Sequence, residues 1–206
     1  MKKISSTVKP TLTDKNKMDR LKFCLSKVNL ANNGDLLFDD LYDYVHNDEK
    51  DNDKKNVESV TAKTIYVQQN NAKPHFSDND ADIVALGSAD DWNIKFKVQL
   101  ANSPNLNVLG LGFFNSIQSL QHQASPHTID ELINCFQDAF HQLEANTLDN
   151  VFTTLQACME SIMLADGGNC YKIPLLSNGK LRREGRLLEK YVCSKEAYLK
   201  AKSNFE

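Results

Sequence analysis

The apolar residues of this 206-residue chain follow two periods, and each period predicts its own kind of element. Alternating or short apolar runs bounded by turn residues predict strands over 64–68 and 93–100, and an earlier strand that leads to Asp48. Apolar positions three and four residues apart predict a helix after Thr13 that includes Val28, and further helices after residue 112. The presence of both periods predicts an α/β fold.

Two helices predicted after residue 127 carry the clearest signals. Thr128 and Glu131 form the pattern of a capping box, and Gly167 and Gly168 mark the end of the second helix. Each helix has one apolar face, so we expect a C-terminal helical hairpin that forms core rather than a partner-binding surface. The apolar positions are Ile129, Leu132, Ile133, Phe136, Phe140 and Leu143 in the first helix, and Leu148, Val151, Phe152, Leu155, Met159 and Ile162 in the second.

The formal net charge is only -3, but the charge is unevenly distributed. Residues 1–30 and the segment from Lys172 onward are basic, whereas residues 35–58 are acidic. Basic ends around an acidic patch suit phosphate contacts that flank a metal centre, and an ordinary solvated surface explains the same pattern. By length the chain is one domain, in which we distinguish a basic lead-in and helix (1–30) from the main body (31–206).

The five cysteines include no C-x-x-C pair, which argues against a disulfide framework and against a zinc site. Cys135 and Cys158 fall on predicted helical core positions, where a free cysteine packs as a small apolar residue. No apolar run has the length of a membrane span, and no apolar signal segment follows the first residues. We therefore expect an intracellular protein of the cytosol or nucleus, not a secreted one, with no membrane partner.

Two polar corner motifs directly follow predicted strands. The first is Gln68-Gln69-Asn70-Asn71-Ala72-Lys73-Pro74-His75, and the second is Asn102-Ser103-Pro104-Asn105-Leu106-Asn107-Val108-Leu109-Gly110. Open α/β sheets place their ligands at the ends of their strands. These two corners are therefore the candidate functional site.

The corner motifs resemble the catalytic domain of mariner-type transposases, which cut and join DNA with a triad of carboxylates. The resemblance continues through other segments of the chain: Lys9-Pro10-Thr11-Leu12-Thr13-Asp14, Arg20-Leu21-Lys22-Phe23-Cys24, Val45-His46-Asn47-Asp48-Glu49-Lys50, Leu111-Gly112-Phe113-Phe114, Ile117-Gln118-Ser119-Leu120-Gln121 and Gly167-Gly168-Asn169-Cys170-Tyr171-Lys172-Ile173-Pro174. It implies a ribonuclease-H-like domain, with a mixed sheet and flanking helices, that binds Mg2+ and DNA. The fold class that we expect is thus a truncated ribonuclease-H-like α/β domain plus the C-terminal helical hairpin.

At the positions that match the triad, this chain has only one carboxylate. Asp48 stands at the first position, where the resemblance implies a catalytic and metal-binding residue; Asn70 replaces the second carboxylate and Gly110 the third. Mg2+ needs oxygen ligands that also compensate its charge, which an amide and a glycine do not supply. We therefore expect this copy to be catalytically inactive. The candidate substitute carboxylates are Glu49, Asp51, Asp78 and Asp82.

The interval from Asp48 to Asn70 is short. It spans 22 positions, whereas two further strands, a crossover helix and their connections need roughly 35 to 40 residues. This predicts an internal deletion near residues 51–60, in a segment whose charged sequence predicts a loop. We also expect that restoring both acids by Asn70→Asp and Gly110→Asp does not restore cleavage, because the two strand ends would not lie side by side.

Three hypotheses follow for the function. The first is a degenerate transposase domain whose remaining DNA binding is weak, independent of sequence and sensitive to salt, because the helix-turn-helix modules of the family have no room here. The second is a domesticated, non-enzymatic module that binds a protein or a nucleic acid. The third is an active nuclease that uses the substitute carboxylates.

Overall fold

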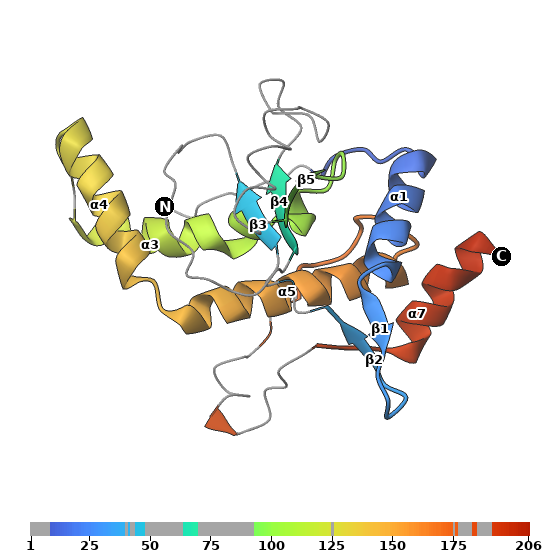
Figure 1. Cartoon of the computed structure of the whole chain (residues 1–206). Helices are drawn as coiled ribbons and strands as arrows, with labels where there is room; N and C mark the ends of the chain where they lie inside the picture. Colours follow the sequence, from blue (N-terminus) through green and yellow to red (C-terminus); the bar gives the residue numbers. More distant parts are fainter. Residues whose placement is uncertain are drawn as a thin grey trace.

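The computed structural model describes residues 9–39, 41, 44–47, 64–69, 93–124, 126–174, 176, 183–184 and 191–206. In this part of the chain the protein is mixed α/β, with several helices and two small sheets (Figure 1). The predicted fold class is therefore confirmed at the level of α/β. The predicted loop and deletion near residues 51–60 lie outside the described residues.

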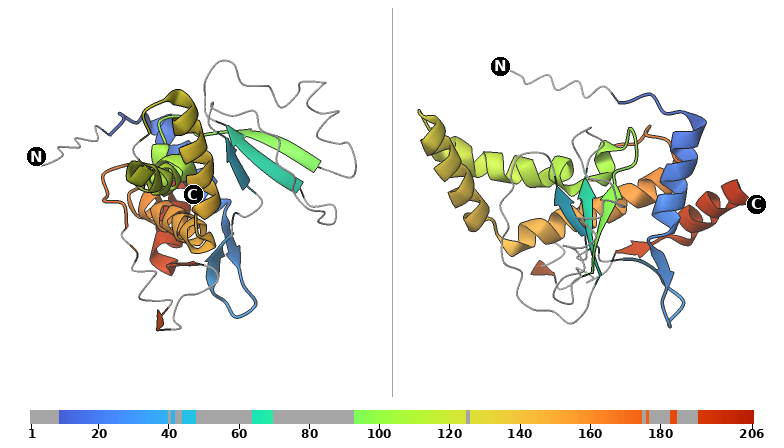
Figure 2. Two further views of the ribbon diagram at one scale, coloured as in Figure 1. Left: turned by 90° about the vertical axis from the view of Figure 1, so that its left-hand side faces the viewer. Right: turned by 45° about the horizontal axis from the view of Figure 1, so that its top comes forward.

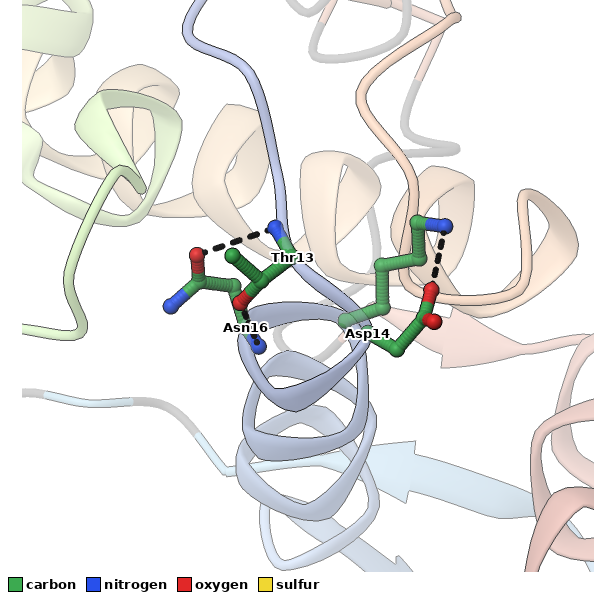
Figure 3. Close-up of polar contacts among 4 residues, drawn as sticks. Thr13, Asp14 and Asn16 are labelled. Atoms are coloured by element: carbon green, nitrogen blue, oxygen red, sulfur yellow. Dashed lines mark hydrogen bonds and ion pairs between the residues drawn. The ribbon is translucent and has the colours of Figure 1, made fainter.

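Helix α1 (Asp14–Leu25) begins at the predicted cap. The Thr13 Oγ1 atom accepts a hydrogen bond from the Asn16 amide at 3.2 Å, and Asn16 Oδ1 accepts one from the Thr13 amide at 3.2 Å (Figure 3). These bonds satisfy N–H groups that have no partner inside the helix. The prediction that the helix includes Val28 is wrong: the Lys27 amide bonds to the Cys24 carbonyl, which tightens the last turn and ends the helix.

A small antiparallel sheet follows α1. Strands β1 (Val28–Leu30) and β2 (Leu36–Phe38) form a hairpin around Gly34, whose φ of 86° suits glycine. Strand β6 (Val192–Cys193), from the other end of the chain, pairs with the free side of β2. The expected boundary after residue 30 falls inside this hairpin, and the division into a lead-in and a main body stays a prediction.

A second sheet contains β3 (Tyr44–Asn47), β4 (Thr64–Gln69) and β5 (Asn93–Val98), in that order and all parallel. It lies to one side of the helices (Figure 2, left). The strands predicted over 64–68 and 93–100 are confirmed, although the second ends at Val98. The mixed sheet that we expected is not found among the described residues, because one sheet is purely antiparallel and the other purely parallel.

The core surrounds helix α5 (Ala145–Leu164), which crosses most of the molecule (Figure 1). Four residues of its predicted apolar face are buried (Val151, Leu155, Met159 and Ile162), whereas Phe152 is partly buried and Leu148 is exposed. The helix packs against α1 and against α7 (Lys195–Lys202), which is followed by a short 3-10 turn (Ser203–Phe205). The helix ends as predicted: Gly167 has a φ of 78° and its amide bonds to the Ile162 carbonyl at 2.9 Å. The buried core residues include Leu21, Cys24, Phe38, Leu106, Val151, Leu155, Met159, Ile162, Met163, Cys193, Ala197 and Ala201.

Helix α4 (Ile129–Gln142) begins at the predicted capping box, but it does not form a core with α5. It packs on α3 (Phe114–Ala124) and leads away from the rest of the molecule (Figure 1). The predicted core-forming hairpin is therefore wrong. Leu143 and Glu144 have extended backbones between the two helices, which turns α4 away from α5. The apolar face of α5 is already covered by α1 and α7.

The five cysteines should separate into distinct classes of reactivity. Cys24, Cys158 and Cys193 are buried, Cys135 is only half-buried, and Cys170 is exposed. Burial raises the pKa of Cys158 and of Cys193 to about 12, and that of Cys24 still higher. Because the thiolate is the reacting form, a colorimetric disulfide reagent should label Cys170 at least about a hundredfold faster than the three buried thiols. Equal rates in the folded protein would contradict this core, and urea should release all five.

Candidate functional site

The parallel sheet ends its strands at one edge. In the register of the sheet, Asn47 of β3 lies opposite Gln69 of β4, and Gln69 lies opposite Val98 of β5. Asp48 and Asn70 are the next residues of the chain, and they lie outside the described residues. Since the residues that precede them are direct partners, the expectation that the short interval keeps these two strand ends apart is wrong. The strands pair directly, with no intervening strand between them in the sheet order.

Two glutamine residues connect the end of β4 to the second corner motif. The Gln99 amide donates a hydrogen bond to the Gln69 carbonyl at 2.8 Å, which continues the ladder between β4 and β5 beyond their assigned ends. The buried Gln68 side chain donates through Nε2 to the Leu106 carbonyl at 3.0 Å. The second motif, which includes a 3-10 turn (Pro104–Leu106), is thereby fixed against the edge of the sheet.

Amide side chains also organise the inside of the second motif. Gln99 Nε2 donates to the Ser103 carbonyl at 2.9 Å, and Asn107 Nδ2 donates to Gln99 Oε1 at 3.1 Å. Asn107 Oδ1 in turn accepts from the Leu109 amide at 3.0 Å. The side chains of Gln99 and Asn107 are thus engaged in hydrogen bonds within the motif, where they stabilise the turn.

Arg20 of α1 is a structural residue that the sequence analysis missed. Its side chain is buried, with Nη1 donating to Ser103 Oγ at 3.1 Å and Nη2 donating to the Gly168 carbonyl at 3.2 Å. It therefore joins α1, the second corner motif and the end of α5. Arg20 belongs to Arg20-Leu21-Lys22-Phe23-Cys24, one of the segments that carry the resemblance, and this could have drawn attention to it. Only the structure shows what the arginine contacts.

A second set of bonds connects the same region to the start of the described chain. Lys9 Nζ donates to the carbonyls of Asn169 and Tyr171, at 2.6 and 2.5 Å, and Asn169 Nδ2 donates to the Pro10 carbonyl at 2.6 Å. Asn105 Nδ2 bonds to the Tyr171 hydroxyl at 3.2 Å. Burial raises the pKa of Tyr171, and this hydrogen bond acts in the opposite direction. Segments that are far apart in the sequence thus meet at one place.

Gly110 lies in a turn of π-helix (Leu109–Phe113) that leads into α3. It is exposed, and a Cβ atom added to it would meet no other atom within 4 Å. A larger side chain at this position would therefore extend into open space. Wide turns of this kind occur often at functional sites.

The described residues at this edge do not fit a Mg2+ ion. The polar side chains next to the strand ends are neutral amides that are engaged in hydrogen bonds, and Gly110 has no side chain. Within the described ranges, no three His, Cys, Asp or Glu residues lie close enough together to hold a metal ion. Asp48, Asn70 and His75, together with the substitute carboxylates Glu49, Asp51, Asp78 and Asp82, are outside those ranges. No catalytic step can be derived from this donor set.

Comparison with protein-family models, with curated proteins and with solved structures found no match. Among the helices that the structure describes, none has the length and the apolar character needed to cross a membrane.

Proposed function

We propose that this chain is a ribonuclease-H-like catalytic domain of the mariner transposase type that has kept the frame of its site and lost its catalytic activity. One observation supports this proposal above the others. The segments that carry the resemblance, from Lys9, Arg20, Asn102 and Gly167 onward, are joined to one another by hydrogen bonds, and the segment from Asn102 is also bonded to the end of β4. Separate motifs that matched by chance would not be expected to converge in this way.

The parallel strands support the same proposal. Strands β3 and β4 are neighbours whose ends pair in register, which would bring the first two triad positions side by side. Gly110, exposed just before α3, has room for the side chain of the third triad residue. In this copy Asn70 and Gly110 leave Asp48 as the only acid of the triad. We propose that the protein therefore neither binds Mg2+ tightly nor cleaves DNA, and that its DNA contacts are the sequence-independent phosphate contacts of its basic ends.

Restoring the two missing acids tests the proposal. The natural sequence should show no Mg2+- or Mn2+-dependent nicking of supercoiled DNA. The variant with Asn70→Asp and Gly110→Asp should bind Mn2+ at least about tenfold more tightly, as measured by calorimetry, because three carboxylates compensate the charge of the ion. Gly110 is exposed with open space around it, so the added side chain requires no rearrangement. The expectation that this variant does not regain cleavage stays a prediction, and the same nicking assay tests it.

Two controls identify where the ion binds. The variant with Gly110→Asn and an unchanged Asn70 adds a side chain of the same shape without a charge, and it should bind Mn2+ like the natural sequence. Adding Asp48→Asn to the double variant should abolish the gain. An unchanged gain without Asp48 would mean that the three positions do not share a site, and metal-dependent nicking by the natural sequence would refute the loss of activity.

A non-enzymatic interaction module is the second candidate function. It is favoured by the exposed apolar face of α4, which the core of the protein does not use.

A further inference from the structure

The outer face of α4 is apolar and exposed. The side chains of Ile129, Leu132, Ile133 and Phe140 retain 76, 48, 50 and 43% of their accessible surface. The helix packs on α3 along the neighbouring strip of the same side, since Ala139 is buried, Phe136 is half-buried and the ring of Phe140 lies 6.2 Å from that of Phe113. Four large apolar residues on one helix face form the kind of patch that marks an interaction surface. We call these four residues the α4 face.

The region around the α4 face is acidic. From Val98 to Tyr171 the sequence contains no Lys or Arg. The same stretch contains seven acidic residues: Asp130, Glu131, Asp138, Glu144, Asp149, Glu160 and Asp166. The first three belong to α4 itself. Glu160 and Asp166 lie at the far end of α5, where Glu160 accepts hydrogen bonds from Tyr191 and Ser194 and Asp166 pairs with Lys200. The charge near α4 is therefore that of its own three acids and of Glu144, with no Lys or Arg on the helix, and it favours a cationic partner over a nucleic acid.

An open hollow of about 460 Å³ lies beside α4, where α3 meets the corner between α4 and α5. Hydroxyl and amide side chains and two leucines line it, and Glu144 is the one charged residue among its described lining residues. A cationic side chain that entered the hollow would meet a carboxylate and several hydrogen-bond acceptors.

We propose that the α4 face is the docking site for a basic amphipathic helix of a partner protein. The apolar stripe of that helix packs on the α4 face, and its Lys and Arg side chains lie toward the acidic residues of α4 and toward Glu144. Recognition of an amphipathic helix by an apolar surface with complementary charge at its edge is a common mode of peptide binding. A second copy of this chain is disfavoured, because it would bring the same acidic residues together. The proposal does not depend on a transposase origin.

The test uses the full chain and a fluorescent peptide probe. The probe is a helix-forming peptide of Leu and Lys in which the leucines follow a helical stripe, and binding is measured by fluorescence anisotropy. We expect saturable binding that weakens as the salt concentration rises. A Leu and Lys peptide of the same composition in scrambled order, and a striped peptide of Leu and Glu, should bind at least about tenfold more weakly.

Matched variants of the protein locate the site. Ile133→Gln should weaken binding of the striped Leu and Lys peptide about tenfold, as expected for a central apolar contact. Ile129→Gln should weaken it as well, and both variants should fold normally because the two side chains are largely exposed. Leu199→Gln is the control, since Leu199 is 63% exposed on α7 and lies outside the acidic stretch, and it should leave binding within about twofold of the natural sequence. Glu144→Gln should reduce both the affinity and its dependence on salt.

Three results would overturn the proposal. If the scrambled peptide bound as tightly as the striped one, binding would depend on the charge of the peptide alone and not on an apolar stripe. An unchanged affinity in Ile133→Gln and Ile129→Gln would place the peptide elsewhere. A dimer of the natural chain in sedimentation that Ile133→Gln abolishes would show that a second copy covers the α4 face.

Discussion

Gly167→Ala should destabilise the protein by about 3 kcal/mol or more. Gly167 has a φ of 78°, which costs a residue with a Cβ roughly 1 to 2 kcal/mol. In addition, the new Cβ would lie 2.3 Å from the Lys17 carbonyl oxygen, so the backbone of α1 or the end of α5 must move. That movement would strain the Arg20 contact to the Gly168 carbonyl, which spans the same two helices.

Two other glycines separate the contributions to this loss. Gly34 has a φ of 86° but open space around it, so Gly34→Ala should cost only the conformational term, about 1 kcal/mol. Gly110 lies in a helical turn with open space, so Gly110→Ala should be neutral or slightly stabilising. Urea denaturation of the three variants measures the series. Similar losses for Gly167→Ala and Gly34→Ala would show that the close contact with Lys17 does not exist.

Arg20→Ala should destabilise the protein by about 3 to 4 kcal/mol. The change removes charge-assisted hydrogen bonds to Ser103 and Gly168 and leaves the buried Ser103 hydroxyl and the partly buried Gly168 carbonyl with fewer partners. It also creates a cavity where the buried arginine side chain was. Lys15→Ala is the matched control, since Lys15 is an exposed basic residue on the same helix and its loss should change stability by less than about 0.5 kcal/mol.

A double-mutant cycle measures the contact itself. If Arg20 acts through Ser103, the losses of Arg20→Ala and Ser103→Ala should be less than additive, by about 1 kcal/mol. Strict additivity would show that the two side chains contribute independently, and a loss for Arg20→Ala no greater than that for Lys15→Ala would show that the arginine is not buried.

The sequence predicted best those features that depend on neighbouring residues. Thr13 and Thr128 cap their helices as expected, and Gly167 ends α5, because a cap needs only a suitable side chain or backbone within one turn. The face of α5 was also predicted, since its period is long and regular. Strands β1 and β6 were not, because strands of three and two residues have too short a pattern to recognise.

The features that the sequence did not predict depend on distant partners. Periodicity shows that α4 has an apolar face, but it does not show whether another part of the chain covers that face. The sequence analysis also missed that β3 and β4 pair directly and end side by side. The length of the interval was judged against a set of elements assumed to lie between the two strands, and the number of residues alone does not show which elements are there. Within the candidate site, the sequence showed that Gly110 lacks a carboxylate, and the structure added that the position is open.

The pairing of β6 with β2 has a consequence for the order in which the protein can form. The central strand of the antiparallel sheet lies near the start of the chain, and one of its partners lies near the end, followed at once by α7. A ribosome makes these two partners at very different times, and the closing of such a large loop is slow. The nascent chain must therefore keep one side of β2 and the α7-facing side of α5 without their native cover until β6 and α7 have been synthesised. Exposed apolar surface and an unpaired strand edge favour aggregation, so we expect the chain to be most prone to aggregate during that period.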